Sequence, residues 1–297
     1  MEKDVFKMKP KTAIITGGTS GIGYETAKGL LKHDYHVVLA GRNKTKGTDA
    51  VQSLNQYGSI IFLEVDFAEL ASIQHFTDQI KAMYTSIDCL INNAGVMIPP
   101  LRYTKDGFEL QFGTNHLAHF ALTGLLLPLL IQSPQSRIVT ITSIAAIKGF
   151  IDFENLDGSK KYQPMVFYRQ SKHANWLFAK ELHRRLTKIG ASTISIAAHP
   201  GLANTNLLSR GSGKQTSLLI RQLLPLFTQS TADGAKPTIY AATDPNLDGG
   251  EWIGPDGFKA WRGEPIVDSI GDKLFDKETA KKLWHVSEKL TNVQYPF

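Results

Sequence analysis

The sequence predicts a doubly wound α/β fold, in which helices cover both faces of a parallel sheet within one domain spanning residues 1–297. Three observations predict it. Short apolar runs alternate with helical patterns along most of the chain, as in successive βαβ units. Runs such as residues 137–142 (RIVTIT) are apolar enough for strands covered on both faces. A glycine-rich turn at residues 17–23 follows the first run directly, which is typical of the Rossmann architecture.

The expected strands and helices follow from these patterns in chain order. Each strand range is short and rich in Val, Ile, Leu or Ala, and we expect strands at residues 12–16, 36–40, 60–65, 89–92, 137–142 and 193–198, with a weaker one at 251–253. Each helix range repeats apolar residues at helical spacing, and we expect helices at residues 21–32, 44–56, 69–84, 106–131, 168–189 and 231–243. In such a fold the ligand lies beyond the carboxyl ends of the strands.

Two later segments break this alternation. Residues 202–229 form a long connection with an apolar helical portion at 218–227. We interpret this connection as a lid over an apolar substrate; the alternatives are a helix packed on its own core, or a membrane-surface segment in which Arg221 is the only charge. Residues 255–297 form a C-terminal extension, also placed to cover the substrate, with a helix expected at 277–290.

Composition narrows the class of protein. The net charge is +6, but the basic residues are spread along the chain, which favours a solvated surface and an anionic cofactor over nucleic-acid binding. The single cysteine, Cys89, excludes an internal disulfide and lies in a predicted strand, where we expect it to be buried. We see no run long and apolar enough to span a bilayer and no export signal in the basic start at residues 1–11, so we expect a cytoplasmic protein.

The glycine-rich turn predicts a dinucleotide site. Its glycines permit a tight strand-to-helix turn and let the backbone approach a pyrophosphate, which the free N–H groups of the following helix would bind. An ordinary tight turn is the alternative, but the place of the turn after the first strand and before an amphipathic helix favours a dinucleotide. The residues that we expect to bind here are Gly17, Thr19, Ser20, Gly21, Ile22 and Gly23.

The end of the second expected strand indicates which dinucleotide binds. An NAD site usually carries an acid here, whereas this chain has Arg42 followed by Asn43. An arginine can hold a 2′-phosphate in bidentate fashion, so we expect NADP(H). Asp66, followed by Phe67, comes after the third strand and can accept a hydrogen bond from an adenine amino group. The alternative for Asp66 is the N-cap of the helix that begins near Glu69.

A second constellation indicates proton transfer. Tyr168 and Lys172 are four residues apart, so a helix places them on one face, where an ammonium can lower the pKa of a phenol. By itself, a tyrosine four residues before a lysine often occurs on an exposed helix without any function. Ser143, however, ends the strand expected at 137–142, where it can hold a substrate oxygen, and Asn115 lies on the preceding long helix.

Together these residues resemble the short-chain dehydrogenase/reductase family over nearly the whole chain. Residues 16–23 are similar to its cofactor turn, 92–95 to its NNAG motif, and Asn115, Ser143, Tyr168 and Lys172 to its catalytic tetrad. The resemblance adds Asn93, Ala94, Gly95, Pro200, Gly201 and Thr205 to the residues expected at the cofactor, with Tyr168 and Lys172. Residues 115–120, 199–201, 254–257 and 283–290 further resemble the retinol-dehydrogenase-like and protochlorophyllide-reductase-like branch.

The resemblance implies a mechanism. Tyr168 would act as general acid on a carbonyl reduced by NADPH, and as base in the reverse direction. Lys172 would lower the pKa of that phenol and bind the nicotinamide ribose. Ser143 would hold the substrate oxygen, and Asn115 would organise a water in a proton relay. Many membrane-bound members of the branch carry an N-terminal apolar anchor; we see no such run at residues 1–11 and therefore do not expect retinoid specificity to carry over.

Other interpretations remain open. A cofactor-sensing regulator without turnover is one, although it has no physical reason to keep Ser143, Tyr168 and Lys172 together; reduction of a C=C bond is another. His116 and His119 have helical spacing, but no third ligand follows, so we expect packing or supporting roles and no metal site. The resemblance also implies a homodimer or homotetramer, because members of this family commonly associate through the helices that correspond to residues 106–131 and 168–189.

Overall fold

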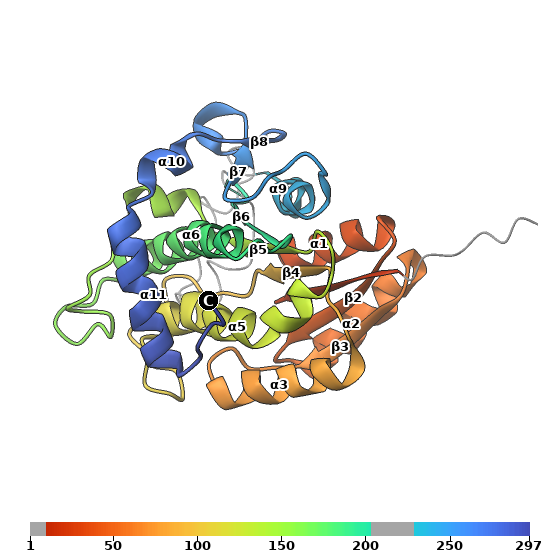
Figure 1. Cartoon of the computed structure of the whole chain (residues 1–297), viewed down its shortest axis with the longest axis horizontal. Helices are drawn as coiled ribbons and strands as arrows, with labels where there is room; N and C mark the ends of the chain where they lie inside the picture. Colours follow the sequence, from red (N-terminus) through yellow and green to blue (C-terminus); the bar gives the residue numbers. More distant parts are fainter. Residues whose placement is uncertain (1–9, 203–228) are drawn as a thin grey trace, which may run out of the picture.

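The computed structural model describes residues 10–202 and 229–297, and within these ranges the chain forms one eight-stranded sheet (Figure 1). The strand order is β3-β2-β1-β4-β5-β6-β7-β8; all neighbours pair in parallel except β7 and β8, which are antiparallel. The doubly wound fold is therefore confirmed. The strands are β1 (Lys11–Thr16), β2 (Tyr35–Gly41), β3 (Ile60–Glu64), β4 (Cys89–Asn92), β5 (Arg137–Ile141), β6 (Ile194–Ala198), β7 (Trp252–Pro255) and β8 (Pro265–Val267).

Every predicted strand is present, within two residues of its expected ends. The edge strand β8 was not predicted. It has only three residues, begins with a proline and is largely exposed, so it carries no apolar signal of a buried strand.

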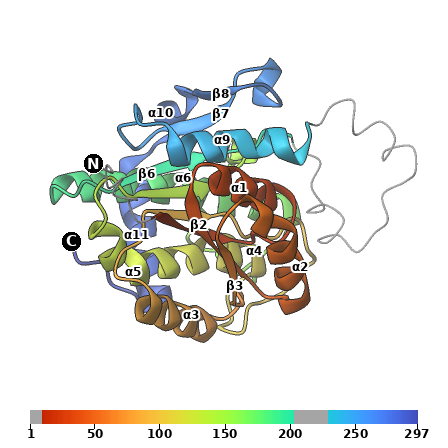
Figure 2. The ribbon, with the colours of Figure 1, turned by 90° about the vertical axis from the view of Figure 1, so that its right-hand side faces the viewer.

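Helices cover both faces of the sheet, as Figures 1 and 2 show. Alternate residues of β1 face opposite sides: Ala13 and Ile15 pack with α1, α2 and α9, whereas Ile14 packs with α3, α5 and α6. Cys89 is fully buried, and burial raises the pKa of its thiol to about 12, which confirms its predicted place in the core. The covering helices are α1 (Gly21–Lys32), α2 (Lys44–Leu54), α3 (Leu70–Met83), α5 (Ala118–Ile131), α6 (Pro164–Lys188) and α9 (Thr231–Thr243).

The helix expected at 106–131 is interrupted. It consists of α4 (Leu110–Phe112), a π-helical turn (Gly113–Leu117) and α5. By length and composition the segment Leu110–Ile131 could cross a membrane, with a mean hydropathy of 1.3, so the expectation that no run has this character was wrong. In the fold, 78% of its most apolar window is buried inside the protein, which accounts for its composition.

The C-terminal extension adds β8, α10 (Ile270–Leu274) and α11 (Lys277–Thr291), and α11 lies against the outer faces of α5 and α6 (Figure 1). Trp284 is buried between Phe120 of α5 and Phe178 of α6, with ring centroids 5.1 and 5.9 Å away. The Tyr295 hydroxyl donates to the Phe120 carbonyl at 2.8 Å. The helix faces that we expected between subunits are therefore covered by the chain's own C-terminal residues.

Candidate active site

The cofactor turn has the geometry that its glycines predict. Gly17 and Gly21 have φ values of +67° and +60°, which favour glycine. A Cβ on Gly23 would lie 2.5 Å from the Gly17 carbonyl oxygen, so no larger residue fits there without moving the turn. Ser20 is the N-cap of α1 but makes no side-chain hydrogen bond to it, and so leaves the first N–H groups without a side-chain partner. The turn, with Thr19 and Ile22, thus presents the donors that a pyrophosphate needs.

The last residue of β1 joins this turn to the loop after β4. The Thr16 Oγ1 accepts hydrogen bonds from the backbone N–H groups of Asn93 and Ala94, both at 2.8 Å. The Asn93 amide nitrogen donates back to the Thr16 carbonyl at 2.7 Å. The NNAG segment and the glycine turn are therefore held as one unit at the carboxyl edge of the sheet. We had counted Thr16 only as part of the turn motif, since its partners lie far away in the sequence.

Arg42 and Asn43 follow β2 beside this unit. The Arg42 side chain is 76% exposed, and its nearest acid is Asp66, with 3.9 Å between Nη1 and Oδ2. An ion pair this long and exposed holds the guanidinium only weakly, so Arg42 can turn toward a ligand. Asn43 has a different role, because its side chain caps α2 by accepting from the Lys46 N–H at 2.9 Å.

Asp66 and Phe67 occupy the turn after β3. The Asp66 Oδ1 accepts from the Ala68 N–H at 3.0 Å, and the N-cap of α3 is Glu69. The alternative that Asp66 caps this helix is therefore wrong. Phe67 is buried in the core, and its ring centroid lies 5.3 Å from that of His119. Its side chain therefore packs against His119 and presents little surface to a ligand.

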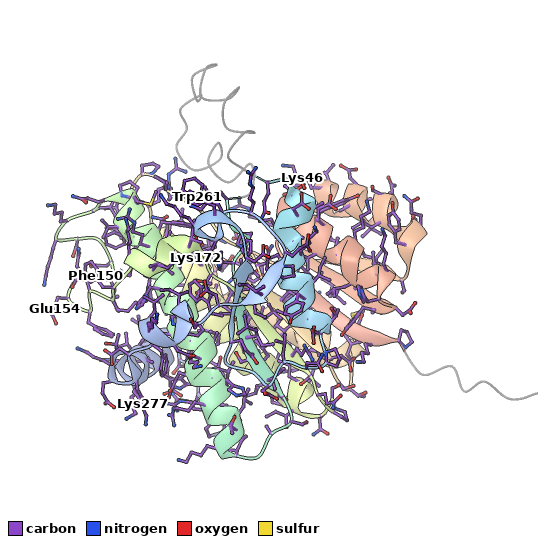
Figure 3. All side chains as sticks on the ribbon, turned by 90° about the horizontal axis from the view of Figure 1, so that it is seen from above. Lys46, Phe150, Glu154, Lys172, Trp261 and Lys277 are labelled. Carbon is purple, nitrogen blue, oxygen red and sulfur yellow. The ribbon has the colours of Figure 1, made fainter. Side chains whose placement is uncertain are left out.

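Tyr168 and Lys172 both lie buried on α6, on the side that faces β5. The Lys172 Nζ donates to the Ile141 carbonyl at 3.0 Å, at the carboxyl end of β5 (Figure 3 labels Lys172). α6 begins at Pro164, four residues earlier than we expected, because a proline is well suited to the first turn of a helix. The proposed acid and its lysine are thus well inside the helix, where their positions are fixed.

The pKa of Tyr168 moves in the opposite direction from our expectation. Burial raises it, and the Ser143 hydroxyl lowers it by less. Lys172 is not among the causes of the shift, and burial lowers the pKa of Lys172 itself to about 8. In the protein alone Tyr168 is therefore a neutral phenol that can give a proton. Ser143 caps the 3₁₀ turn Ile144–Lys148 by accepting from the Ala145 N–H at 3.2 Å.

Asn115 lies in the π-helical turn and is completely buried. Its Oδ1 accepts from the Val96 N–H at 2.8 Å, and its Nδ2 donates to the Val96 carbonyl at 3.0 Å and the Ser171 Oγ at 2.9 Å. A Cβ on Gly95 would lie 2.9 Å from Asn115 Oδ1 and 3.8 Å from Lys172 Nζ, so these groups surround Gly95 closely. The side chain of Asn115 therefore fastens the NNAG loop to α6.

The segment expected at the nicotinamide is described only in part. Gly201 has φ +62°, and a Cβ there would overlap the carbonyl of Trp261, so this part of the C-terminal extension covers the Pro200–Gly201 loop. Thr205 and the apolar portion of the expected lid at 218–227 lie outside the described residues.

The two histidines at helical spacing have separate partners, which confirms the supporting roles that we expected. His119 contacts the Thr16 Oγ1 and the Asn115 carbonyl, both at 2.9 Å. His116 contacts the Ser287 Oγ of α11 at 2.9 Å. Across residues 10–202 and 229–297, no group of three or more His, Cys, Asp or Glu residues is placed to hold a metal ion.

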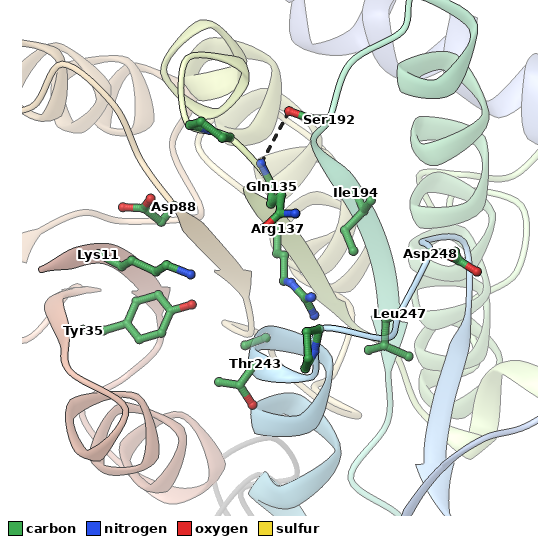
Figure 4. A pocket seen from close by; sticks show the side chains of 13 residues that line it. Lys11, Tyr35, Asp88, Gln135, Arg137, Ser192, Ile194, Thr243, Leu247 and Asp248 are labelled. Carbon is green, nitrogen blue, oxygen red and sulfur yellow. Dashed lines mark hydrogen bonds between the residues drawn. The ribbon is translucent and has the colours of Figure 1, made fainter. Parts of the chain in front are cut away.

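A cavity of about 420 Å³ lies at the opposite, amino edge of the sheet (Figure 4). Its lining includes the cations Lys11 and Arg137 and the acid Asp88. The Asp88 carboxylate already accepts hydrogen bonds from the Thr12 N–H, at 2.7 Å, and from the Ser133 hydroxyl. None of the predicted site residues lines this cavity. The chemistry expected from the sequence thus gathers at the carboxyl edge alone.

Comparison with known proteins finds similar sequences and structures over most of the chain. The family model described as short chain dehydrogenase matches residues 11–215. Mouse retinol dehydrogenase 14 is 36% identical over 96% of this chain and 87% of its own length, and human polyprenol dehydrogenase is 38% identical over 82% and 76%. The crystal structure of an uncharacterised protein from Mycobacterium Paratuberculosis superposes with a TM-score of 0.80 at 37% identity, covering 97% of this chain and 95% of that one.

Proposed function

Because the chain belongs to the short chain dehydrogenase family, and is an oxidoreductase of its retinol-dehydrogenase-like branch, we propose that it transfers a hydride between NADP(H) and the carbonyl or alcohol group of a lipophilic small molecule. One observation carries the proposal. The buried phenol of Tyr168, the Ser143 hydroxyl that is hydrogen-bonded to it and the buried Lys172 all lie at the carboxyl edge of the sheet. The glycine turn lies at the same edge.

The residues at this edge fit a dinucleotide phosphate. The backbone of residues 17–23 would hold the pyrophosphate, since a side chain at Gly23 would collide with the Gly17 carbonyl and displace the turn whose N–H groups face it. Arg42 would hold the 2′-phosphate, because no acid stands at the end of β2 and the guanidinium is exposed. When bound, the nicotinamide supplies the hydride chemistry, and the protein supplies placement and proton transfer.

Tyr168 is the proposed proton donor. Its raised pKa keeps the phenol protonated at neutral pH, so it can protonate the oxygen of a carbonyl as that oxygen becomes an alkoxide. The Ser143 hydroxyl would donate to the same oxygen and hold it beside Tyr168. In the direction of oxidation Tyr168 has to take the alcohol proton as a phenolate. Burial disfavours the phenolate, so this direction needs a cation close to the phenol to lower its pKa.

Lys172 and Asn115 would support this transfer. With a pKa near 8, Lys172 is mostly charged at pH 7, and its ammonium can bind ribose hydroxyls. The amide of Asn115 is bonded to Val96 and Ser171, so a relay water would need the remaining lone pair of its Oδ1. We therefore assign Asn115 first to holding the loop beside Lys172, and the relay second.

A lipophilic substrate is supported by two observations. The relatives retinol dehydrogenase 14 and polyprenol dehydrogenase are named for apolar alcohols. In this chain Phe258 is 72% exposed and packs edge-on against Trp261, whose carbonyl borders Gly201. An exposed phenylalanine packed on a half-buried tryptophan near the expected nicotinamide site suits an apolar substrate better than a charged one.

A carbonyl panel tests the proposal. Purified protein is mixed with NADPH or NADH and with aldehydes and ketones of increasing alkyl length, and nicotinamide absorbance is followed. We expect turnover with NADPH, and a kcat/KM that rises up to about fourfold per added methylene. Flat traces with every carbonyl and every alcohol would indicate a cofactor-sensing regulator instead. Loss of a conjugated double bond with the carbonyl retained would indicate a C=C reductase.

A further inference from the structure

One buried side chain contacts both halves of the proposed site. His119 lies on the first turn of α5, and its ring is sandwiched between the end of β1 and the π-helical turn. One ring nitrogen, Nε2, lies 2.9 Å from the Thr16 Oγ1, and the other, Nδ1, lies 2.9 Å from the Asn115 carbonyl. The ring therefore bridges the residue that ends β1 before the cofactor turn and the asparagine that holds the loop beside Lys172.

Hydrogen-bond chemistry determines the direction of both bonds. The Asn115 carbonyl can only accept, so Nδ1 carries the proton. Burial lowers the pKa of His119 to about 4, so the ring is neutral and Nε2 accepts. Thr16 is then the donor to Nε2 at 2.9 Å, while its oxygen accepts from the N–H groups of Asn93 and Ala94. The Ile91 carbonyl, at 3.2 Å, is a second and longer acceptor for the same hydroxyl proton, so the bond to His119 selects the shorter of two directions for the Thr16 hydroxyl.

His116, one turn earlier, shows how specific this arrangement is. It is equally buried and neutral, and its Nε2 also meets a hydroxyl, that of Ser287, at 2.9 Å. Its ring packs among aromatic residues of α5 and α6 and faces α11, away from the cofactor turn. The two histidines share chemistry and burial and differ in what they contact.

We propose that His119 is a positioning residue with two separable effects: its Nε2 fixes Thr16, and with it the cofactor-binding loops, while its Nδ1 fixes the Asn115 carbonyl and the π turn beside Lys172. The proposal rests on the proposed function, because it assigns the two bonds to cofactor affinity and to catalytic rate. A merely structural histidine would affect both quantities together, through stability.

Two substitutions separate the bonds. In His119→Asn the amide nitrogen takes the place of Nδ1 and can still donate to the Asn115 carbonyl, but the side chain is too short to reach Thr16. In His119→Gln the amide takes the place of Nε2 and can still accept from Thr16, but it removes the ring N–H that donates to the Asn115 carbonyl. The controls are His116→Asn and His116→Gln, which make the same replacements of a buried ring facing α11; His116→Asn loses the Ser287 contact, whereas the Nδ1 of His116 has no hydrogen-bond partner to lose among the described residues.

The measurements are the Kd of NADPH by fluorescence titration and kcat with an active aldehyde, alongside the thermal midpoint of each variant. We expect His119→Asn to raise the Kd about tenfold with kcat nearly unchanged, and His119→Gln to lower kcat about tenfold with the Kd nearly unchanged. The His116 variants should change neither quantity by more than about twofold, even where their thermal midpoints fall equally.

Equal changes in both quantities for the two His119 variants, or no change in either, would overturn the proposal. So would His116 variants that change the Kd or kcat as much as the His119 variants do. If the wild-type protein reduces no carbonyl, the proposed function fails. The NADPH titrations of His119→Asn and His119→Gln then still decide the Thr16 half of the proposal.

Discussion

Substituting alanine at Gly23 tests whether the glycine turn is shaped for a pyrophosphate. The added Cβ would lie 2.5 Å from the Gly17 carbonyl oxygen, 2.6 Å from the Asn93 Nδ2 and 3.0 Å from the Gly18 Cα. Two of these three atoms are backbone, so the turn itself has to move. The Asn93 bond to the Thr16 carbonyl, at 2.7 Å, is the first to be disturbed.

The expected magnitudes follow from opposing effects. Overpacking of this kind costs about 1–3 kcal/mol, and alanine returns about 1 kcal/mol of helix propensity over glycine. The free energy of unfolding should therefore fall by about 0–2 kcal/mol. Cofactor affinity receives no such compensation, because displaced donors no longer point at the pyrophosphate. We expect the Kd of NADPH to rise about 10- to 100-fold, which corresponds to about 1.4–2.8 kcal/mol.

Gly29→Ala is the matched control, since Gly29 lies on the same helix. A Cβ there would overlap Cδ1 of Ile239, the far end of a flexible side chain, and no cofactor-binding atom. Titration of NADPH against intrinsic fluorescence, with urea unfolding in parallel, should find a comparable change in stability but an unchanged Kd for this control. Normal affinity in Gly23→Ala, or equal losses in both variants, would refute the assigned role of the turn.

Three further predictions concern other parts of the chain. Arg42→Ala should weaken NADPH about 10- to 100-fold while leaving NADH within about twofold, by titration; equal losses would place the 2′-phosphate elsewhere. Burial lowers the pKa of His116 and His199 to about 3 and of His119 to about 4. Below pH 6.5 these histidines are therefore protonated in the unfolded chain but stay neutral in the folded chain. Stability is then fully present above pH 6.5 and is lost as the pH falls, by about 2 kcal/mol per histidine at pH 5, and an equal urea midpoint at pH 7 and pH 5 would contradict this. Because α11 covers α5 and α6, light scattering and cross-linking should find no association through these helices, and a dimer cross-linked there would show that α11 can leave them.

The sequence was sufficient for the sheet, because strands buried on both faces are apolar throughout. β5 (Arg137–Ile141) is an example, with four of its five residues buried. The sequence was insufficient where burial is shallow or where the helical register changes. β8 is exposed, and the π turn at Gly113–Leu117 alters the register within one continuous apolar segment.

The site was predicted at the level of residues but not of their electrostatics. Spacing placed Tyr168 and Lys172 on one buried face of a helix, which the structure has. The direction of the Tyr168 pKa shift depends on how deeply the phenol is buried, and no local pattern reports that depth. The partners of His119 were beyond sequence reasoning for a similar reason, since Thr16 is 103 residues away along the chain.

The central claim is that Tyr168 gives the proton that completes reduction. It is tested most directly by the steady-state reduction rate of Tyr168→Phe, with NADPH affinity measured on the same sample. We expect kcat to fall about 10²- to 10⁴-fold while the Kd of NADPH stays within about twofold, because phenylalanine removes only the hydroxyl. A variant that reduces the same aldehyde at the wild-type rate would contradict the account.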